Sequence, residues 1–281
     1  GDSLELDGVG GSLLGPLAVD RLRWRSEGVV VTAHGARFAW QPYDLFRGRA
    51  RIDQLEADRI EVDLTTPAVP PPKKEPAVIR LPERIDLPVT VSVGRIAAGD
   101  IVVRRDGNEL VRVAGLEAVA TAVPDLIELT GLSARVLAAG NEITLGGEAS
   151  MRPLEPYQIK ARIQSRADLQ GKPLRVDLRA DGQLASLDTR INAQWVDARV
   201  VARSQVQPLD PRPLRELKVD ISDLDLAKID PALPQTDIVA KLEAELFPAW
   251  SDRPDPPLLV GPIEIGNSLA GPLDVKRLPG S

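Results

Sequence analysis

Side chains that could carry out catalysis are few in this sequence and stand far apart. His34 is the only histidine in the 281 residues, and the absence of cysteine excludes thiolate nucleophiles, disulfides and cysteine-ligated metals. Ser150 and Ser165 lack the glycine-flanked surroundings of an activated hydroxyl. We therefore expect His34 to be a solvated residue of a loop or strand end, and we expect no enzymatic activity.

Two further patterns could in principle hold a ligand. Gly8, Gly10 and Gly11 form a glycine-rich stretch, but it lacks the lysine and the following helix of a phosphate-binding loop. A run of aspartates could suggest calcium, yet its spacing departs from the helix-loop-helix calcium loop and the glycine of that loop's sharp turn is missing. We predict a strand face and a turn, with no metal site and no cofactor, at Asp220, Asp223, Asp225 and Asp230.

An enzyme acting on envelope polysaccharide stays open as an alternative, because paired carboxylates for glycoside hydrolysis cannot be recognised from sequence. Saccharide sites usually need flat aromatic platforms, and only 3% of the residues are aromatic. One local aromatic cluster exists. We expect it to form a small core around a helical turn, at Phe38, Trp40, Tyr43 and Phe46.

The composition favours a long aliphatic surface over a core built on aromatic rings. Apolar residues make up 43% of the chain, and the net charge is −6, from 41 acidic and 35 basic residues. The two signs are mixed along the sequence and no basic stripe is visible. We therefore expect no nucleic-acid partner and only weak attraction to anionic headgroups. No apolar run is long enough to span a bilayer as a helix.

Alternation of apolar and polar residues dominates the chain and predicts strands with one apolar face. We expect a meander of about 15 strands. Two coverings of the apolar face are possible: a second sheet, or a groove that curls around a ligand. The alternation is clearest in the segments in which apolar residues occupy every second position: 60–64, 87–93, 157–163, 174–180, 191–195, 217–221 and 238–246.

Turn signals and helical signals are short. Asp106-Gly107-Asn108 predicts a hairpin, and Gly146-Gly147 and Asp181-Gly182 predict further reversals. Pro42 to Gly48 can form one or two helical turns, which we expect to direct Leu45 and Phe46 inwards. Leu226 to Leu233 is a second helical candidate, interrupted by Pro231.

The chain divides at a proline-rich stretch. We predict an N-terminal strand-rich unit at 1–66, an extended linker at 67–77 and a continuation of the sheet at 78–265. The segment Gly15–Leu22 is echoed by Gly271–Leu278, so we expect residues 266–281 to begin a further, truncated repeat. The start at Gly1 leads us to expect that a signal or anchor preceded it.

A family resemblance emerges when the first 65 residues are considered together. In order, they contain a glycine-proline turn, a strand ending in tryptophan, a short valine strand, an aromatic segment and two acidic-aliphatic strands. This order resembles the N-terminal region of the TamB family, the inner-membrane-anchored subunit of the translocation and assembly module. The segments that carry the resemblance are 11–17, 19–24, 28–31, 38–42, 45–49, 52–57 and 60–62, with weaker similarity at 224–226 and 230–234.

The resemblance implies a mainly β fold, in which a long curved antiparallel sheet forms an open groove with an aliphatic interior and a few helical turns. It also implies a periplasmic protein tethered to the inner membrane through an anchor upstream of Gly1. The family meets its outer-membrane partner TamA through a region absent from this chain. Phospholipid is the implied ligand, and the implied task is one segment of a lipid-transfer conduit. The alternative is a structural module that assists outer-membrane protein assembly without conducting lipid.

If this interpretation is correct, aliphatic side chains in the middle of the alternating strands form the lining of the groove. Acyl chains would lie on the apolar face while headgroups stay in water. The predicted lining residues are Ile60, Val62, Val89, Val91, Ile159, Ile163, Leu174, Val176, Leu178, Ile191, Val219 and Leu242.

Overall fold

The computed structural model describes most of the chain as strand. The described residues are 3–12, 14–26, 28–65, 82–138, 140–169, 171–210, 213–229, 232–246 and 259–267. The predicted linker at 67–77 and all but the first two residues of the predicted repeat at 266–281 therefore lie outside the described residues.

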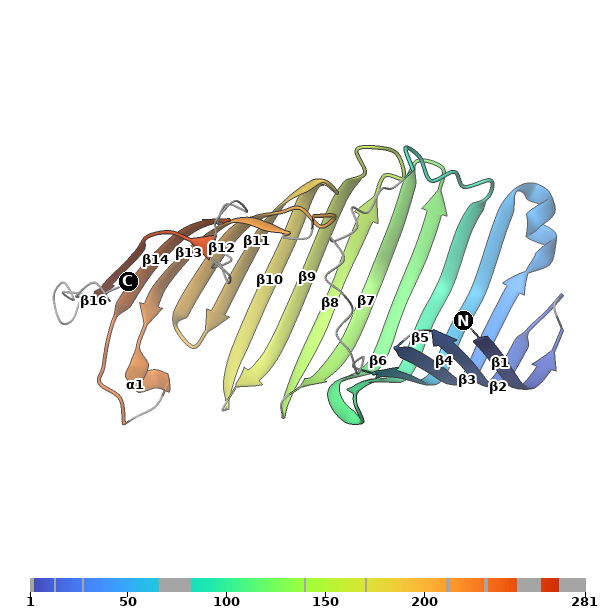
Figure 1. Cartoon of the computed structure of the whole chain (residues 1–281), viewed down its shortest axis with the longest axis horizontal. Helices are drawn as coiled ribbons and strands as arrows, with labels where there is room; N and C mark the ends of the chain where they lie inside the picture. The colour runs from blue at the N-terminus through green and yellow to red at the C-terminus, as the bar shows by residue number, and fades with distance from the viewer. Residues whose placement is uncertain are drawn as a thin grey trace.

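The described residues form a single sheet of sixteen strands. From β1 to β15 the strands follow one another in chain order along the long axis, from the blue N-terminal strands to the orange C-terminal ones, and β16 pairs with β14 (Figure 1). The mainly β prediction is confirmed. The strands are β1 (Ser3–Gly11), β2 (Leu17–Ser26), β3 (Val29–Gln41), β4 (Arg49–Leu64), β5 (Thr90–Arg105), β6 (Asn108–Val123), β7 (Leu126–Ala138), β8 (Asn141–Met151), β9 (Gln158–Leu169), β10 (Lys172–Gln183), β11 (Ser186–Trp195), β12 (Ala198–Val206), β13 (Leu214–Leu224), β14 (Ile238–Leu246), β15 (Leu259–Val260) and β16 (Ile263–Asn267).

The sheet is antiparallel except at one position, where β4 and β5 run parallel. A parallel pair needs a long connection that returns the chain to the starting edge. The end of that connection is held against the β8–β9 turn: Ile85 donates its backbone N–H to the Pro153 carbonyl at 2.9 Å, and the Tyr157 hydroxyl donates to the Pro82 carbonyl. The predicted antiparallel sheet is thus confirmed except at β4–β5, where the meander is interrupted.

Two short helices interrupt the strands, the 3-10 helix η1 (Pro42–Arg47) and α1 (Leu226–Ile229). Both helical candidates are confirmed in position, but the side chains of η1 do not point inwards. Phe46 is 89% exposed, Tyr43 76% and Leu45 41%. The predicted aromatic core around η1 is therefore wrong. Within that cluster, Phe38 and Trp40 lie with their ring centroids 6.3 Å apart.

One of the three predicted reversals is correct. Asp106 and Gly107 join β5 to β6 with φ angles of 50° and 81°, as a two-residue hairpin of this type requires. Gly146 and Gly147 instead lie inside β8, and Asp181-Gly182 lie inside β10. Glycine in these strands does not mark a turn, because neighbouring strands pair through it.

A transverse line crosses β1 to β6 where strand pairing is interrupted. Gly35 on this line has a φ of 59°, and a Cβ atom there would lie 2.1 Å from Oδ2 of Asp58. On either side of the line the apolar alternation changes parity: Leu4 and Leu6 precede it on β1, and Val9 follows it. The residues on the line are Gly8, Asp20, Gly35, Asp58, Gly99 and Gly115.

No second layer covers the sheet within the described ranges. Substantial contacts between elements occur only between hydrogen-bonded neighbours and between η1 and β4. The fully buried residues are correspondingly few; Val102 and Pro153 are the largest of them. Of the two coverings considered for the apolar face, a second sheet is absent from the described part of the chain, and the curved, unclosed sheet forms an open groove.

Candidate functional site

The apolar face consists of rows of side chains that cross the sheet from strand to strand. Residues directly opposite each other on neighbouring strands point to the same side, so the register defines each row. The longest row passes through β1 to β12 without a polar residue. Its members are Leu6, Leu22, Ala33, Ile60, Ile101, Val113, Val136, Ile143, Ala167, Leu174, Trp195 and Ala198.

Eleven of the twelve predicted lining residues fall into five such rows on this face. Five of the eleven share one row across β9 to β14, where Ile163, Leu178, Ile191, Ala202, Val219 and Leu242 follow one another. Ile60 and Leu174 lie in the twelve-residue row. Val91 shares a third row with Ile159, while Val62 and Val176 lie in two further rows, on opposite sides of the twelve-residue row.

Val89 is the exception, since it lies in the bend before β5 and outside the strand register. The alternation in the sequence predicted that this strand begins before Val89, whereas β5 begins at Thr90. Pro88 precedes Val89 and cannot donate a ladder hydrogen bond, which is a signal for a later strand start.

Side chains on the apolar face are neither buried like a core nor fully exposed. All the predicted lining residues are half-buried except Ile163, which is 36% exposed. Neighbouring aliphatic side chains cover each other sideways while their tips stay accessible. A surface of this kind can gain further burial from an apolar ligand.

A polar pair on β11 and β12 interrupts this face, and its hydroxyls are satisfied locally. Thr189 and Ser204 lie opposite each other on β11 and β12, and their hydroxyls are hydrogen-bonded to each other. The Thr189 hydroxyl also donates to the Ser204 carbonyl at 3.3 Å. The interruption therefore presents few free polar groups to an apolar ligand.

Sequence reasoning missed the part of the apolar face that β1–β3, β6–β8 and β12 contribute. The parity of the alternation changes within β1, β2, β3 and β6 at the line of glycine and aspartate residues, so a strict period of two does not fit these strands. Glycine or aspartate at the parity change is the signal that could have revealed them. The residues missed include Leu6, Leu22, Ala33, Val113, Val136 and Ile143.

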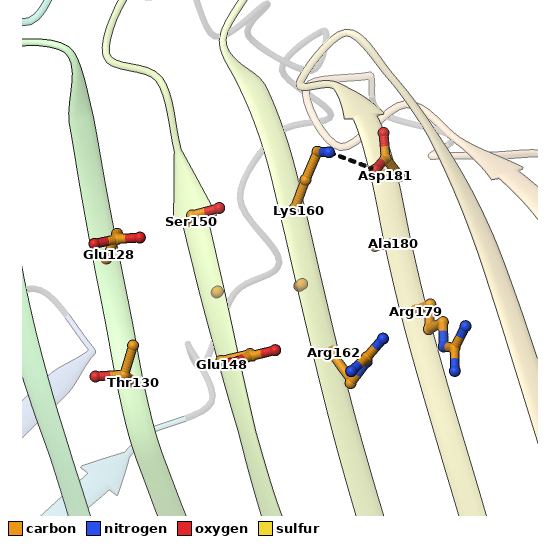
Figure 2. Close-up of a pocket in the computed structure, with 11 residues that line it drawn as sticks. Glu128, Thr130, Glu148, Ser150, Lys160, Arg162, Arg179, Ala180 and Asp181 are labelled. Atoms are coloured by element: carbon orange, nitrogen blue, oxygen red, sulfur yellow. Dashed lines mark ion pairs between the residues drawn. The ribbon is translucent and has the colours of Figure 1, made fainter.

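The opposite face is polar and carries a hollow of about 540 Å³ across β7 to β10. Glu128, Glu148, Lys160, Arg162 and Arg179 are among its lining side chains, and an ion pair of 3.6 Å joins Lys160 to Asp181 (Figure 2). No aromatic side chain lines this hollow. It therefore lacks the flat platform that a saccharide site uses.

The polar face of β3 to β6 is a network of ion pairs. Arg59 contacts Glu61 at 2.8 Å, and Arg112 contacts Glu109 at 2.9 Å. The hydrogen bond and charge of Arg112 lower the pKa of the Glu109 carboxyl, and a hydrogen bond from Gln41 lowers that of Asp53. Both shifts favour the ionised form of the carboxyl in the folded chain.

Residues considered for chemistry occupy structural positions. His34 lies in the middle of β3, paired with Arg21 and Arg59, so its predicted position in a loop or at a strand end is wrong. The Asp225 carboxylate accepts the backbone N–H of Ala227 at 3.1 Å and that of Thr236 at 3.0 Å, which fixes the turn at α1. No cluster of metal-ligating side chains occurs among the residues whose structure is described. Asp230 lies outside that part of the chain.

The uncovered apolar rows suit adsorption of an elongated apolar ligand.

Where the structure is described, none of the helices is long and apolar enough to cross a bilayer.

Comparison with known families gives one match. The family model described as TamB, N-terminal domain, matches residues 2–142. Neither the curated proteins nor the solved structures contain a match.

Proposed function

The chain belongs to the TamB N-terminal domain family, and from this premise we propose that it is a periplasmic segment of a conduit that carries phospholipid acyl chains. The observation that carries the proposal is the uncovered apolar face. Its longest row continues over twelve strands without a polar residue. The family is not one of enzymes, which supports a binding role and not a catalytic one.

The energetics of an open aliphatic face fit transport better than storage. Burying a methylene group contributes about 0.8 kcal/mol, and an open face covers roughly half of each group, so a chain of about 16 carbons gains about 6 kcal/mol. That gain holds a lipid on the sheet. Because the rows repeat from strand to strand with little polar interruption, no single position on the face retains the chain.

The succession of strands gives the conduit its length. Neighbouring strands lie about 4.8 Å apart, so the series from β1 to β15 provides a surface on the order of 70 Å long. Acyl chains would move across the strands, along the rows, while headgroups remain at the open side of the groove in water. Partnership with TamA and tethering at the inner membrane are part of the same proposal, and both would involve regions other than the residues described.

A second candidate function is assistance in outer-membrane protein assembly without lipid conduction. The observation that favours it is β1, which pairs only with β2 among the described strands and whose residues are all exposed. An edge of this kind can accept a further strand.

Lipid extraction and mass spectrometry of the purified chain separate the two functions. The conduit predicts phospholipid that co-purifies at a defined ratio and exchanges with added acyl chains. A chain that is free of lipid and does not bind a fluorescent fatty acid would leave the assembly function as the better account.

Val176→Arg tests the lining directly, and Arg175→Ala on the opposite face is its control. The long arginine stem can reach water from an open groove, so the fold should survive. A charge in hydrocarbon costs about 3 kcal/mol, so acyl-chain binding should weaken roughly 100-fold. Normal fatty-acid binding by folded Val176→Arg would remove this position from the conduit. Unfolding of the variant would argue instead for a closed apolar core.

A further inference from the structure

Arginine side chains gather on the polar face of β9 to β12. Each of these four strands presents three consecutive outward positions, which the register aligns into a grid of three rows. The first row consists of arginine alone, and the third contains arginine on three of its four strands. We call these seven residues the arginine grid: Arg162, Arg166, Arg175, Arg179, Arg190, Arg199 and Arg203.

Acidic side chains are almost absent from the three rows of outward positions that contain the arginine grid. The middle row contains Gln164, Asp177, Asn192 and Val201, so Asp177 is its only acid. The outward positions of β9 to β12 together hold eight basic and four acidic residues, a net charge of +4. The whole chain has a net charge of −6. The positive charge is therefore a local property of this face.

Charge repulsion among the arginines of the grid disfavours folding when no ligand is bound. Arg162, Arg179 and Arg190 stand directly opposite one another on three neighbouring strands, and like charges in this position repel. All seven arginines are exposed. Of the seven, Arg203 alone has an ion pair with another described residue, Asp220, at 3.7 Å.

The polar face of β2 to β6 is built differently. Most of its arginines in mid-strand have carboxylates within 4.0 Å, as in Arg37 with Asp58 and Arg95 with Glu117, and Arg23 is an exception. The repulsion in the grid is thus not an unavoidable result of building strands with arginine. A ligand that supplies the missing negative charge would offset it.

We propose that the arginine grid binds the anionic phosphate headgroups of a membrane surface. Guanidinium groups bind phosphate oxygens in a bidentate manner. The grid extends about 14 Å across the strands and about 14 Å along them, in two dimensions. Its shape fits a planar array of phosphates, whereas an extended acidic peptide would need only one row. This surface is on the face opposite the apolar rows, and its role does not depend on the proposed conduit.

Vesicle co-sedimentation tests the proposal. The chain is mixed with phosphatidylcholine vesicles that contain about a third phosphatidylglycerol, and with vesicles of phosphatidylcholine alone. The triple variant Arg162→Gln, Arg179→Gln, Arg190→Gln should bind the anionic vesicles roughly 100-fold more weakly than the wild type, because each basic residue contributes about fivefold. Binding should also be lost at about 0.5 M salt.

The control variant removes the same charge elsewhere. Arg25→Gln, Arg49→Gln and Arg105→Gln replace exposed arginines on β2, β4 and β5 that have no ion pair with a described residue. This variant should bind within about threefold of the wild type. A thermal melt should show that both triple variants are folded.

Three results would overturn the proposal: equal vesicle binding by the two triple variants, equal binding to neutral vesicles, or binding to soluble polyglutamate in place of vesicles. The last result would identify an acidic polypeptide as the partner. Val176→Arg distinguishes this proposal from the conduit, because it should lose fatty-acid binding while its binding to anionic vesicles stays normal.

Discussion

The polar faces of β1–β6 and of β9–β12 are built from the same residue types in different arrangements. In the N-terminal part, Arg104 lies within 3.6 Å of Glu61 and 3.7 Å of Asp63. In the C-terminal part, Arg179 has Asp177 and Asp181 as its neighbours along β10 but no ion pair with either. Its neighbours across the strands are Arg162 and Arg190. The strand register decides which of these surroundings an arginine has.

The difference separates two uses of surface charge. Paired charges in β1–β6 stabilise a region where the strand alternation is interrupted by glycine and aspartate. The arginines of β9–β12, of which only Arg203 has an ion pair with a described residue, lie on strands with regular alternation, which need no such support. The regular part of the sheet can therefore present a charged face to a partner.

The largest expected effect is that of Gly35→Ala, at the line where the strands of the N-terminal part change parity. The positive φ is strained for alanine, and the new Cβ would collide with the Asp58 carboxylate, which Arg37 holds at 2.8 Å. We expect a loss of about 3 kcal/mol in the free energy of unfolding, measured by chemical denaturation. Gly10→Ala has open space around its Cβ and should change stability by less than about 0.5 kcal/mol. Equal effects would contradict the structural role of the line.

The next effect is that of Glu56→Gln in the ion-pair network. The Glu56 side chain is 9% exposed and lies 3.2 Å from Arg95 and 3.5 Å from Arg37. Neutralising it leaves two arginines without their shared carboxylate, and we expect a loss of about 2 kcal/mol. Denaturant unfolding measures the change. Glu148→Gln on the exposed polar face of β8 is the control and should be nearly neutral.

A smaller effect of opposite sign is expected in the arginine grid. The double variant Arg179→Gln, Arg190→Gln removes a directly opposed pair of like charges and should stabilise the chain by about 0.5 kcal/mol. The gain should appear as a raised melting temperature in low salt and vanish at about 0.5 M salt. A lowered melting temperature would mean that the two arginines stabilise the sheet through contacts of their aliphatic stems.

The smallest expected effect is a loss of stability at acid pH. The pKa values of Glu109 and Asp53 are lowered in the folded chain by hydrogen bonds from Arg112 and Gln41, respectively. Their stabilisation is therefore present above the unfolded pKa values of about 4 and is lost as the pH falls through the folded values. Hydrogen exchange between about pH 5 and pH 3 should show earlier loss of protection in β4–β6 than in β9–β12. Asp53→Asn and Glu109→Gln together should reduce that difference.

The amino-acid sequence by itself determined the class of fold and most of the apolar face in β9–β14. Ile159 to Ile163 and Leu174 to Leu178 alternate without interruption, and side chains at every second position of a strand must share a face. The hairpin at Asp106-Gly107 is equally local, since both residues tolerate the positive φ angles of the turn.

Only the tertiary structure decided which residues stand beside each other across the strands. Arg162, Arg179, Arg190 and Arg203 are separated from one another by at least ten residues in sequence, so they do not form a basic stripe along the chain, but the register aligns them in one row. A shift of one residue in any register would place an arginine opposite a residue of the apolar face. The reversal of parity at Gly35 likewise depends on the close approach of Asp58 from the next strand. Alternation along one strand fixes the face of each side chain, but hydrogen bonding between strands fixes its neighbours.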